Sequence, residues 1–160
     1  MTLNEALLEK LASWKPPAGR ASLGVSAEGS PWTATVVADE TNPLSGLLWE
    51  LSLRRAKPSN AASETELKTW ADRVSQRGTG LLENLHVVEV DAVRQQAQLR
   101  SEEPSQRGDE VFYYELLLTG TYEVLLRRYK APRQGAGRRE QIASPITHEA
   151  LAKLVSALID

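Results

Sequence analysis

Residues 111–130 read VFYYELLLTGTYEVLLRRYK, and this stretch decides the fold. Two runs rich in Val, Leu, Tyr and Phe, 111–118 and 122–130, flank Thr119 and Gly120. That pattern predicts an antiparallel hairpin with a tight turn. Because sequential antiparallel strands tend to be neighbours, we expect the rest of the chain to extend one antiparallel sheet.

Other segments also show the alternation of a strand. In the segment 47–54, the side chains of Leu47, Trp49, Leu51 and Leu53 are expected to face the core, and those of Leu48, Glu50, Ser52 and Arg54 to face solvent. Further strands are predicted at 21–27, as an edge strand, and at 32–38, 86–91 and 93–100. Residues 139–143 are a candidate for a short return strand. The count is three strands before residue 63 and about four after residue 78.

Three helices are predicted from their capping residues and their apolar period. Thr2 with Glu5 and Ser63 with Glu66 have the spacing of capping boxes, and Thr147 precedes a stripe of leucines that runs to the C-terminus. Pro16 and Gly78 mark the ends of the first two helices. The element order is therefore helix, three strands, helix, about four strands, helix.

The composition fits one globular domain. The chain has 160 residues, of which 41% are hydrophobic and 25% charged, and it contains no cysteine. A chain of this length buries about two thirds of the surface that its unfolded form exposes. We therefore predict a single α+β domain over residues 1–160, a twisted antiparallel sheet with the helices packed on one face.

The N-terminal segment and the net charge restrict the location and the partners. Residues 1–14 carry Glu5 and Glu9 and have neither a basic start nor an unbroken apolar run, so they predict neither a signal peptide nor a membrane span. We expect a cytoplasmic protein with no membrane contact. The formal net charge of −2 argues against a global grip on nucleic acid or anionic lipid but allows a local basic patch.

Motifs for phosphate, dinucleotide or metal binding are incomplete. Gly24 and Gly29 have the spacing of a phosphate-binding loop, but Ser30 and Pro31 follow in place of Lys and Ser or Thr. The nucleophile-elbow pattern fails at Glu28, and Gly135 and Gly137 lack the third glycine of a dinucleotide fingerprint. The two histidines lie far apart, and cysteine is absent. We expect no cofactor, no metal and no assigned catalytic residue.

One acid–base pair remains a hypothesis. Glu89 and Asp91 share a strand face with Val87, and His86 lies on the opposite face as a half-buried residue at the strand end. Both acids are expected in solvent. A catalytic dyad of His86 and Glu89 requires a cleft carboxylate that orients the imidazole.

The most concentrated charge lies in the segment 127–139, which has six basic residues and no acidic one. The residues that we predict to contact an anionic partner are Arg127, Arg128, Tyr129, Lys130, Arg133, Arg138 and Arg139. On a strand, Arg127 and Tyr129 face one side and Arg128 and Lys130 the other, so both faces of the hairpin end carry charge. The alternative is a solvated hairpin that projects past the core.

A nearby segment has the opposite sign. Glu102, Glu103, Asp109 and Glu110 form an acidic loop, and complementary patches of this kind can pair between two copies of a chain. A homodimer or an acidic protein segment is therefore a candidate partner. The four tryptophans, Trp14, Trp32, Trp49 and Trp70, are expected in the core.

The element order in a small acidic chain resembles the type III secretion chaperones. That family consists of compact α+β dimers that hold a partner segment in non-globular form. The resemblance spans most of the chain, rests on element order, and carries no residue-level motif. This sequence has more strands after the second helix than the family plan, and the basic hairpin is not a family feature.

Three functions follow from these observations. The favoured one is a non-enzymatic protein-binding or chaperone-like module. The first alternative is a small-ligand binder or enzyme with a cleft near His86 and Arg127. The second is nucleic-acid binding through the 127–139 hairpin, with bases stacked on Tyr129 or Tyr122, which is the least favoured because the domain is not basic overall.

Overall fold

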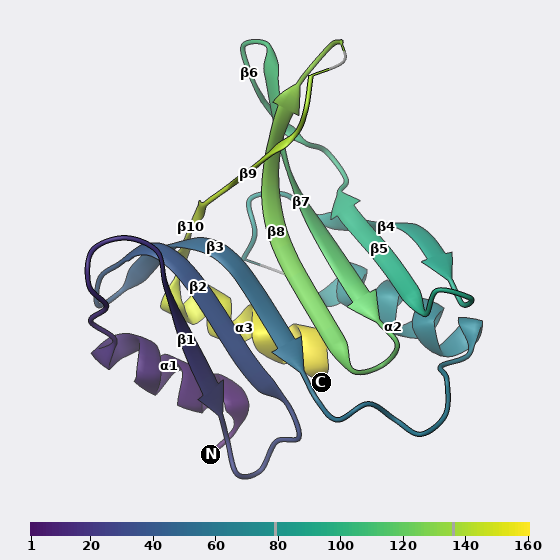
Figure 1. Cartoon of the computed structure of the whole chain (residues 1–160), viewed down its shortest axis with the longest axis horizontal. Coiled ribbons are helices and arrows are strands. Elements are labelled where there is room, and N and C mark those ends of the chain that lie inside the picture. The colour runs from purple at the N-terminus through teal and green to yellow at the C-terminus, as the bar shows by residue number, and fades with distance from the viewer. Residues whose placement is uncertain (79, 136) are drawn as a thin grey trace.

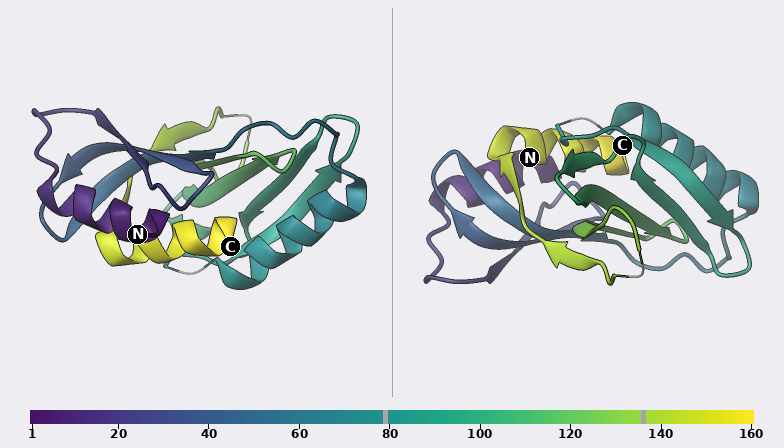
Figure 2. Two further views of the ribbon diagram at one scale, coloured as in Figure 1. Left: turned by 90° about the horizontal axis from the view of Figure 1, so that it is seen from below. Right: turned by 90° about the horizontal axis from the view of Figure 1, so that it is seen from above.

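The computed structural model describes residues 1–78, 80–135 and 137–160, and it confirms the α+β class. Three helices lie on one face of a twisted antiparallel sheet and leave the other face uncovered (Figures 1 and 2). We call the uncovered side the open face. No helix in the described ranges is long and apolar enough to cross a bilayer.

The helices begin at the residues that the capping pattern predicts. They are α1 (Leu3–Ser13), α2 (Glu64–Arg77) and α3 (His148–Ile159). The side chains of Thr2, Ser63 and Thr147 each accept a hydrogen bond from the backbone N–H three residues on, and the first two complete capping boxes.

Ten strands are present in the described part of the chain. Before α2 lie β1 (Ala21–Ser26), β2 (Thr33–Thr41) and β3 (Ser45–Arg54). After α2 come β4 (Leu85–Asp91), β5 (Gln96–Ser101), β6 (Ser105–Arg107), β7 (Glu110–Thr119), β8 (Glu123–Pro132), β9 (Glu140–Ile142) and β10 (Ser144–Thr147). Seven of them form the order β1-β2-β3-β8-β7-β5-β4, in which the predicted β7–β8 hairpin is central.

The count of about four strands after α2 is wrong, because seven are present among the described residues. The short return strand is confirmed as β9, whereas β6 and β10, which are three and four residues long, are too short to be recognised from an alternating pattern. The strand expected at 93–100 begins at Gln96, after a turn in which Gln95 has φ +58°.

The short strands β9 and β10 lie in a fork of the sheet between β8 and β3. β3 pairs with β8 only over Glu50–Arg54 and Glu123–Arg127. Beyond that point the two strands separate, β9 continues along β8, and β10 continues along β3 (Figure 1). β9 and β10 therefore supply hydrogen-bond partners for backbone groups that would be unpaired where β3 and β8 separate.

Two of the three register shifts in the described part of the sheet, both β-bulges, overturn the expected side-chain faces. The β2–β3 register passes from Val37 opposite Glu50 to Ala38 opposite Leu48, so Trp49 is the extra residue. Leu48, Leu51 and Leu53 are buried, whereas Trp49 is only half-buried and lies against the guanidinium of Arg20, 3.4 Å from its ring centroid. The placement of Trp49 on the core face is therefore wrong.

The second bulge lies in β4, between Val87 and Glu89. It adds Val88 to the strand and puts His86 on the same face as Glu89, which corrects the prediction that they face opposite sides. His86 is exposed rather than half-buried, and Glu89 is exposed as predicted.

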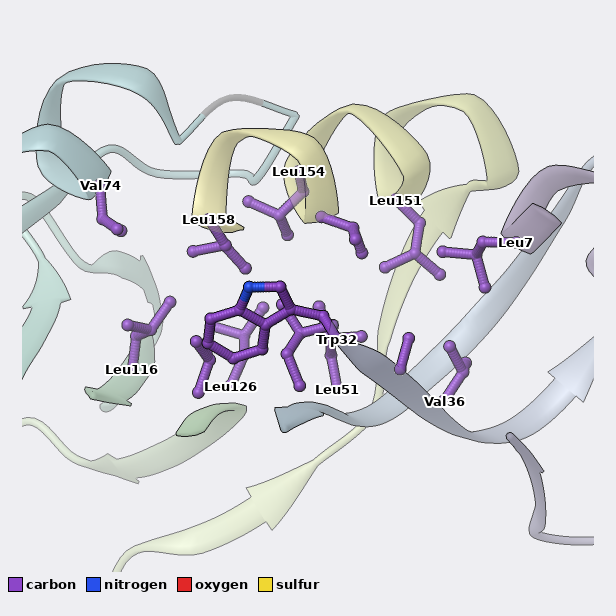
Figure 3. Close-up of a cluster of buried hydrophobic side chains, with 14 of the residues drawn as sticks. Leu7, Trp32, Val36, Leu51, Val74, Leu116, Leu126, Leu151, Leu154 and Leu158 are labelled. Carbon is purple, nitrogen blue, oxygen red and sulfur yellow. The ribbon is translucent and has the colours of Figure 1, made fainter. Parts of the chain in front are cut away.

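The core lies between α3 and the middle of the sheet. Leu151, Leu154 and Leu158 of α3 point towards Trp32, Leu51 and Leu126 (Figure 3). Trp32 and Trp70 fill the core as predicted, with ring centroids 6.1 Å apart, and Trp14 is half-buried at its margin. The indole N–H of Trp70 donates to the carbonyl of Leu158 at 2.8 Å, which ties α2 to α3.

Candidate functional site

The open face carries a row of alternating charges across four strands. The strand registers place Glu50 of β3 beside Arg127 of β8, Arg127 beside Glu115 of β7, and Glu115 beside Arg100 of β5. The Nε of Arg127 donates to Glu50 at 2.6 Å, and the Nη2 of Arg100 lies 3.2 Å from Glu115. Cross-strand pairs of opposite charge stabilise a sheet.

Two tyrosines and a further arginine lie next to this row. Tyr113 of β7 is opposite Tyr129 of β8, and their ring centroids are 5.9 Å apart. Arg139, just before β9, lies over the ring of Tyr129 at 3.9 Å and donates to Glu115 at 2.6 Å. We call the following set the arginine–tyrosine cluster: Glu50, Arg100, Tyr113, Glu115, Arg127, Tyr129 and Arg139.

The acids of the cluster are less exposed to solvent than its bases. The side chains of Glu115 and Glu50 are 9% and 22% exposed, whereas those of Arg127, Arg139 and Arg100 are 39%, 41% and 43% exposed. Glu115 also accepts a hydrogen bond from Gln98 at 3.1 Å. Ion pairs with these two carboxylates therefore fix the positions of three guanidinium groups that are partly exposed to solvent.

The ion pairs favour the charged form of two of these guanidinium groups, those of Arg139 and Arg127. The hydrogen bond to Glu115 raises the pKa of Arg139 above its ordinary value against the opposing effect of burial. For Arg127, burial lowers the pKa, but the hydrogen bonds and charges of Glu50 and Tyr129 together outweigh burial, and the net pKa is raised. With three cations and two anions, the cluster has a local charge of +1 on a chain whose net charge is −2.

Arg128 lies on the other face of β8 and is buried. Its Nη1 and Nη2 donate to the two oxygens of Glu83 at 2.7 and 2.9 Å, and its guanidinium lies 4.3 Å from the ring centroid of Tyr114. Ser101 and Ser105 also donate to Glu83. These contacts belong to the interior, so Arg128 is not placed to meet a partner.

The remaining basic residues of the hairpin lie near its tip. Lys130 is half-buried, with its Nζ 3.3 Å from Glu140 and 3.9 Å from Glu110. Arg133 and Arg138 are exposed, and the backbone N–H of Arg133 donates to the carbonyl of Asp109 at 2.7 Å. One member of the acidic loop, Glu110, therefore approaches Lys130 within the same chain.

His86, on the outer strand β4, lies opposite Arg100 of β5 and so continues the charged row. Hollows in the surface lie elsewhere: between the 57–62 loop and the Thr119–Tyr122 turn, between 14–19 and 39–43, and beside Trp32 and Trp70. None of these three hollows includes His86, Arg127 or Tyr129. Residues 1–78, 80–135 and 137–160 contain no group of three or more His, Asp or Glu side chains able to hold a metal ion.

The sequence pattern alone does not identify the carboxylate partners of the arginines in the cluster, because each pairing depends on a strand register. The hairpin loop is Gly120–Tyr122, and this loop pairs Glu115 with Arg127 and Tyr113 with Tyr129, whereas a two-residue turn at Thr119–Gly120 would place Glu115 opposite Val124. Glu50 and Arg100 come from strands whose registers no local turn defines.

Comparisons of the chain with protein-family models, with curated proteins and with solved structures found no match.

Proposed function

We propose that this protein is a non-catalytic interaction module that binds an acidic segment of a partner protein on its open face. The observation that carries the proposal is the arginine–tyrosine cluster, in which buried Glu115 and half-buried Glu50 position three half-exposed guanidinium groups. Arginine donates in a fixed planar fork that suits carboxylates, and anchored side chains lose little entropy on binding.

The uncovered sheet also suits an extended segment. The ring of Tyr113 is partly exposed beside the guanidinium groups and supplies apolar area for a partner chain, whereas Tyr129 is 8% exposed and is covered by Arg139. Holding such a segment in non-globular form, as the resemblance to type III secretion chaperones implies, is the more specific version of this proposal. The expected cytoplasmic location remains a prediction that cell fractionation with the full chain would test.

The test is an NMR titration of the labelled full chain with a short glutamate-rich peptide, its glutamine counterpart and a short oligothymidylate. We expect the glutamate-rich peptide to shift amide signals of β5, β7 and β8 around the cluster and the glutamine peptide to shift none. Arg139→Gln is expected to weaken peptide binding about tenfold, which corresponds to about 1.4 kcal/mol. Arg138→Gln changes the adjacent exposed arginine and is expected to leave the affinity unchanged.

Each alternative has its own outcome in this titration. Equal losses for the two variants would overturn the cluster as the binding surface, as would shifts spread over the whole molecule. Tighter binding of oligothymidylate than of peptide, with an affinity that falls steeply with salt, would favour the nucleic-acid function instead.

A further inference from the structure

The outer edge of β1 lacks the features that normally block an edge strand. β1 pairs with β2 on one side, and no other strand in the described ranges pairs with it. The strand, ASLGVS, has no charge and no proline, and its register with β2 is uninterrupted. The opposite edge, β4, carries Glu89, Asp91 and a bulge. Natural sheets use charges, prolines and bulges to prevent edge-to-edge pairing.

The sequence around β1 is complementary to itself. Residues 19–29 read GRASLGVSAEG, and reversing them about Gly24 places each residue opposite one of its own kind or of opposite charge. The pairs are Gly19 with Gly29, Arg20 with Glu28, Ala21 with Ala27, Ser22 with Ser26, and Leu23 with Val25.

We infer that the β1 edge is a self-association surface, on which a second copy of this chain pairs antiparallel about a two-fold axis at Gly24. This register keeps the faces of the sheet aligned, because residues an even number apart share a face. Leu23 would meet the partner's Val25 on the helix side, where Val25 is 2% exposed. Ser22, Gly24 and Ser26 are exposed and would continue the open face.

The neighbouring registers fit less well. An axis at Leu23 would place Val25 opposite Ala21 and Arg20 opposite Ser26, which loses both the Leu–Val and the Arg–Glu pair. Gly24 leaves open space at the axis, since a Cβ built there meets nothing within 4 Å. The pairing involves a different surface from the arginine–tyrosine cluster and does not depend on the proposed function.

The expected association is weak, because a pair of six-residue strands forms a small interface. Protein interfaces below about 1,200 Å² are mostly transient. We expect sedimentation velocity of the full chain to show a monomer at low micromolar concentration and a growing dimer as the concentration rises.

Charged substitutions at Ser22 and Ser26 test the register. In the doubly substituted chain S22K/S26K the introduced lysines face each other across the axis, so we expect association to fall at least tenfold. S22E/S26E should behave in the same way. Mixing the two variants should restore a one-to-one heterodimer, visible by native mass spectrometry.

The variant S22K/S26E provides a check that does not depend on loss of association. It places lysine opposite glutamate in both halves of a homodimer and should associate more tightly than the parent chain. Unfolding midpoints of dilute samples establish that each variant folds. A parent chain that stays monomeric at every concentration would overturn the inference, as would a dimer that S22K/S26K does not weaken.

Discussion

At the scale of single residues, Glu83–Arg128 is the most deeply buried ion pair among the described residues. Their side chains are 5% and 6% exposed, and Arg128 donates to both carboxylate oxygens. Removing one partner of such a pair leaves an uncompensated buried charge and costs about 3–5 kcal/mol. We therefore expect Arg128→Met to lower the free energy of unfolding by about that amount in urea denaturation.

A double variant separates the pair from the packing. Glu83→Gln combined with Arg128→Met removes both charges and should be more stable than Arg128→Met alone. If the double variant is no more stable than the single one, the loss comes from the packing of Arg128 against Tyr114 and not from the unpaired carboxylate.

His148 is expected to make folding pH-dependent below about pH 6.5, its ordinary pKa. The residue is 6% exposed, and its Nε2 has no hydrogen-bond partner in the described structure. Burial lowers its pKa below the ordinary value of 6.5, against weaker opposing hydrogen bonds to the backbone of Ser45 and Pro43. As the pH falls, the unfolded chain therefore binds a proton before the folded chain does, and stability decreases.

The two histidines offer a matched pair for this measurement. The slope of unfolding free energy against pH, from urea titrations, is expected to disappear in His148→Gln and to persist in His86→Gln, which changes an exposed residue. Glu83 makes the unfolding free energy depend on pH in a lower range, because its pKa is lowered in the folded chain. Burial alone would raise its pKa, but hydrogen bonds from Arg128, Ser105 and Ser101 hold the net pKa below 4.5. A slope that survives His148→Gln would contradict the assignment.

At the scale of elements, the β7–β8 hairpin depends on Gly120. Its φ is +51°, and a Cβ there would lie 2.6 Å from Cε1 of Tyr122. A residue that carries a Cβ atom loses about 1–2 kcal/mol in this left-handed backbone conformation. Gly120→Ala should therefore lower the unfolding free energy by at least about 1 kcal/mol.

Gly29 is the control for this substitution. It lies in another turn without a positive φ, and a Cβ there meets only the carbonyl of Met1 at 3.8 Å. Gly29→Ala is expected to be within about 0.5 kcal/mol of the parent chain. If the two substitutions lowered the thermal unfolding midpoint equally, the positive φ of Gly120 would not be the reason that this turn needs glycine.

The elements that sequence predicts well are those with a local signal. Capping residues mark where all three helices begin, and Thr119–Gly120 marks the central hairpin. The bulges at Trp49 and Val88 have no such signal, because they depend on which residues of the neighbouring strand stand opposite. For the same reason the carboxylate neighbours of Arg127 in β3 and β7, and the partner of Arg128 in the 80–84 loop, could not be inferred from the sequence.

At the scale of the whole molecule, α3 joins the two ends of the sheet into one core. It packs against α1 and α2, and buried residues from 3 to 158 belong to one continuous cluster. Leu158 is 0% exposed and lies at the C-terminal end of α3, where its carbonyl accepts the Trp70 hydrogen bond. A single domain over 1–160, as the sequence predicts, should therefore unfold as a unit.

Leu158→Ala tests that prediction. Loss of a buried leucine side chain costs about 2–5 kcal/mol, whereas Leu82→Ala, at a side chain 58% exposed, should cost less than about 0.5 kcal/mol. In one cooperative domain, Leu158→Ala lowers amide protection by the same free energy in β2 and in β7, which lie on different sides of the β3–β8 fork. Loss of protection in β7 alone would instead divide the sheet at the fork into two independently stable units.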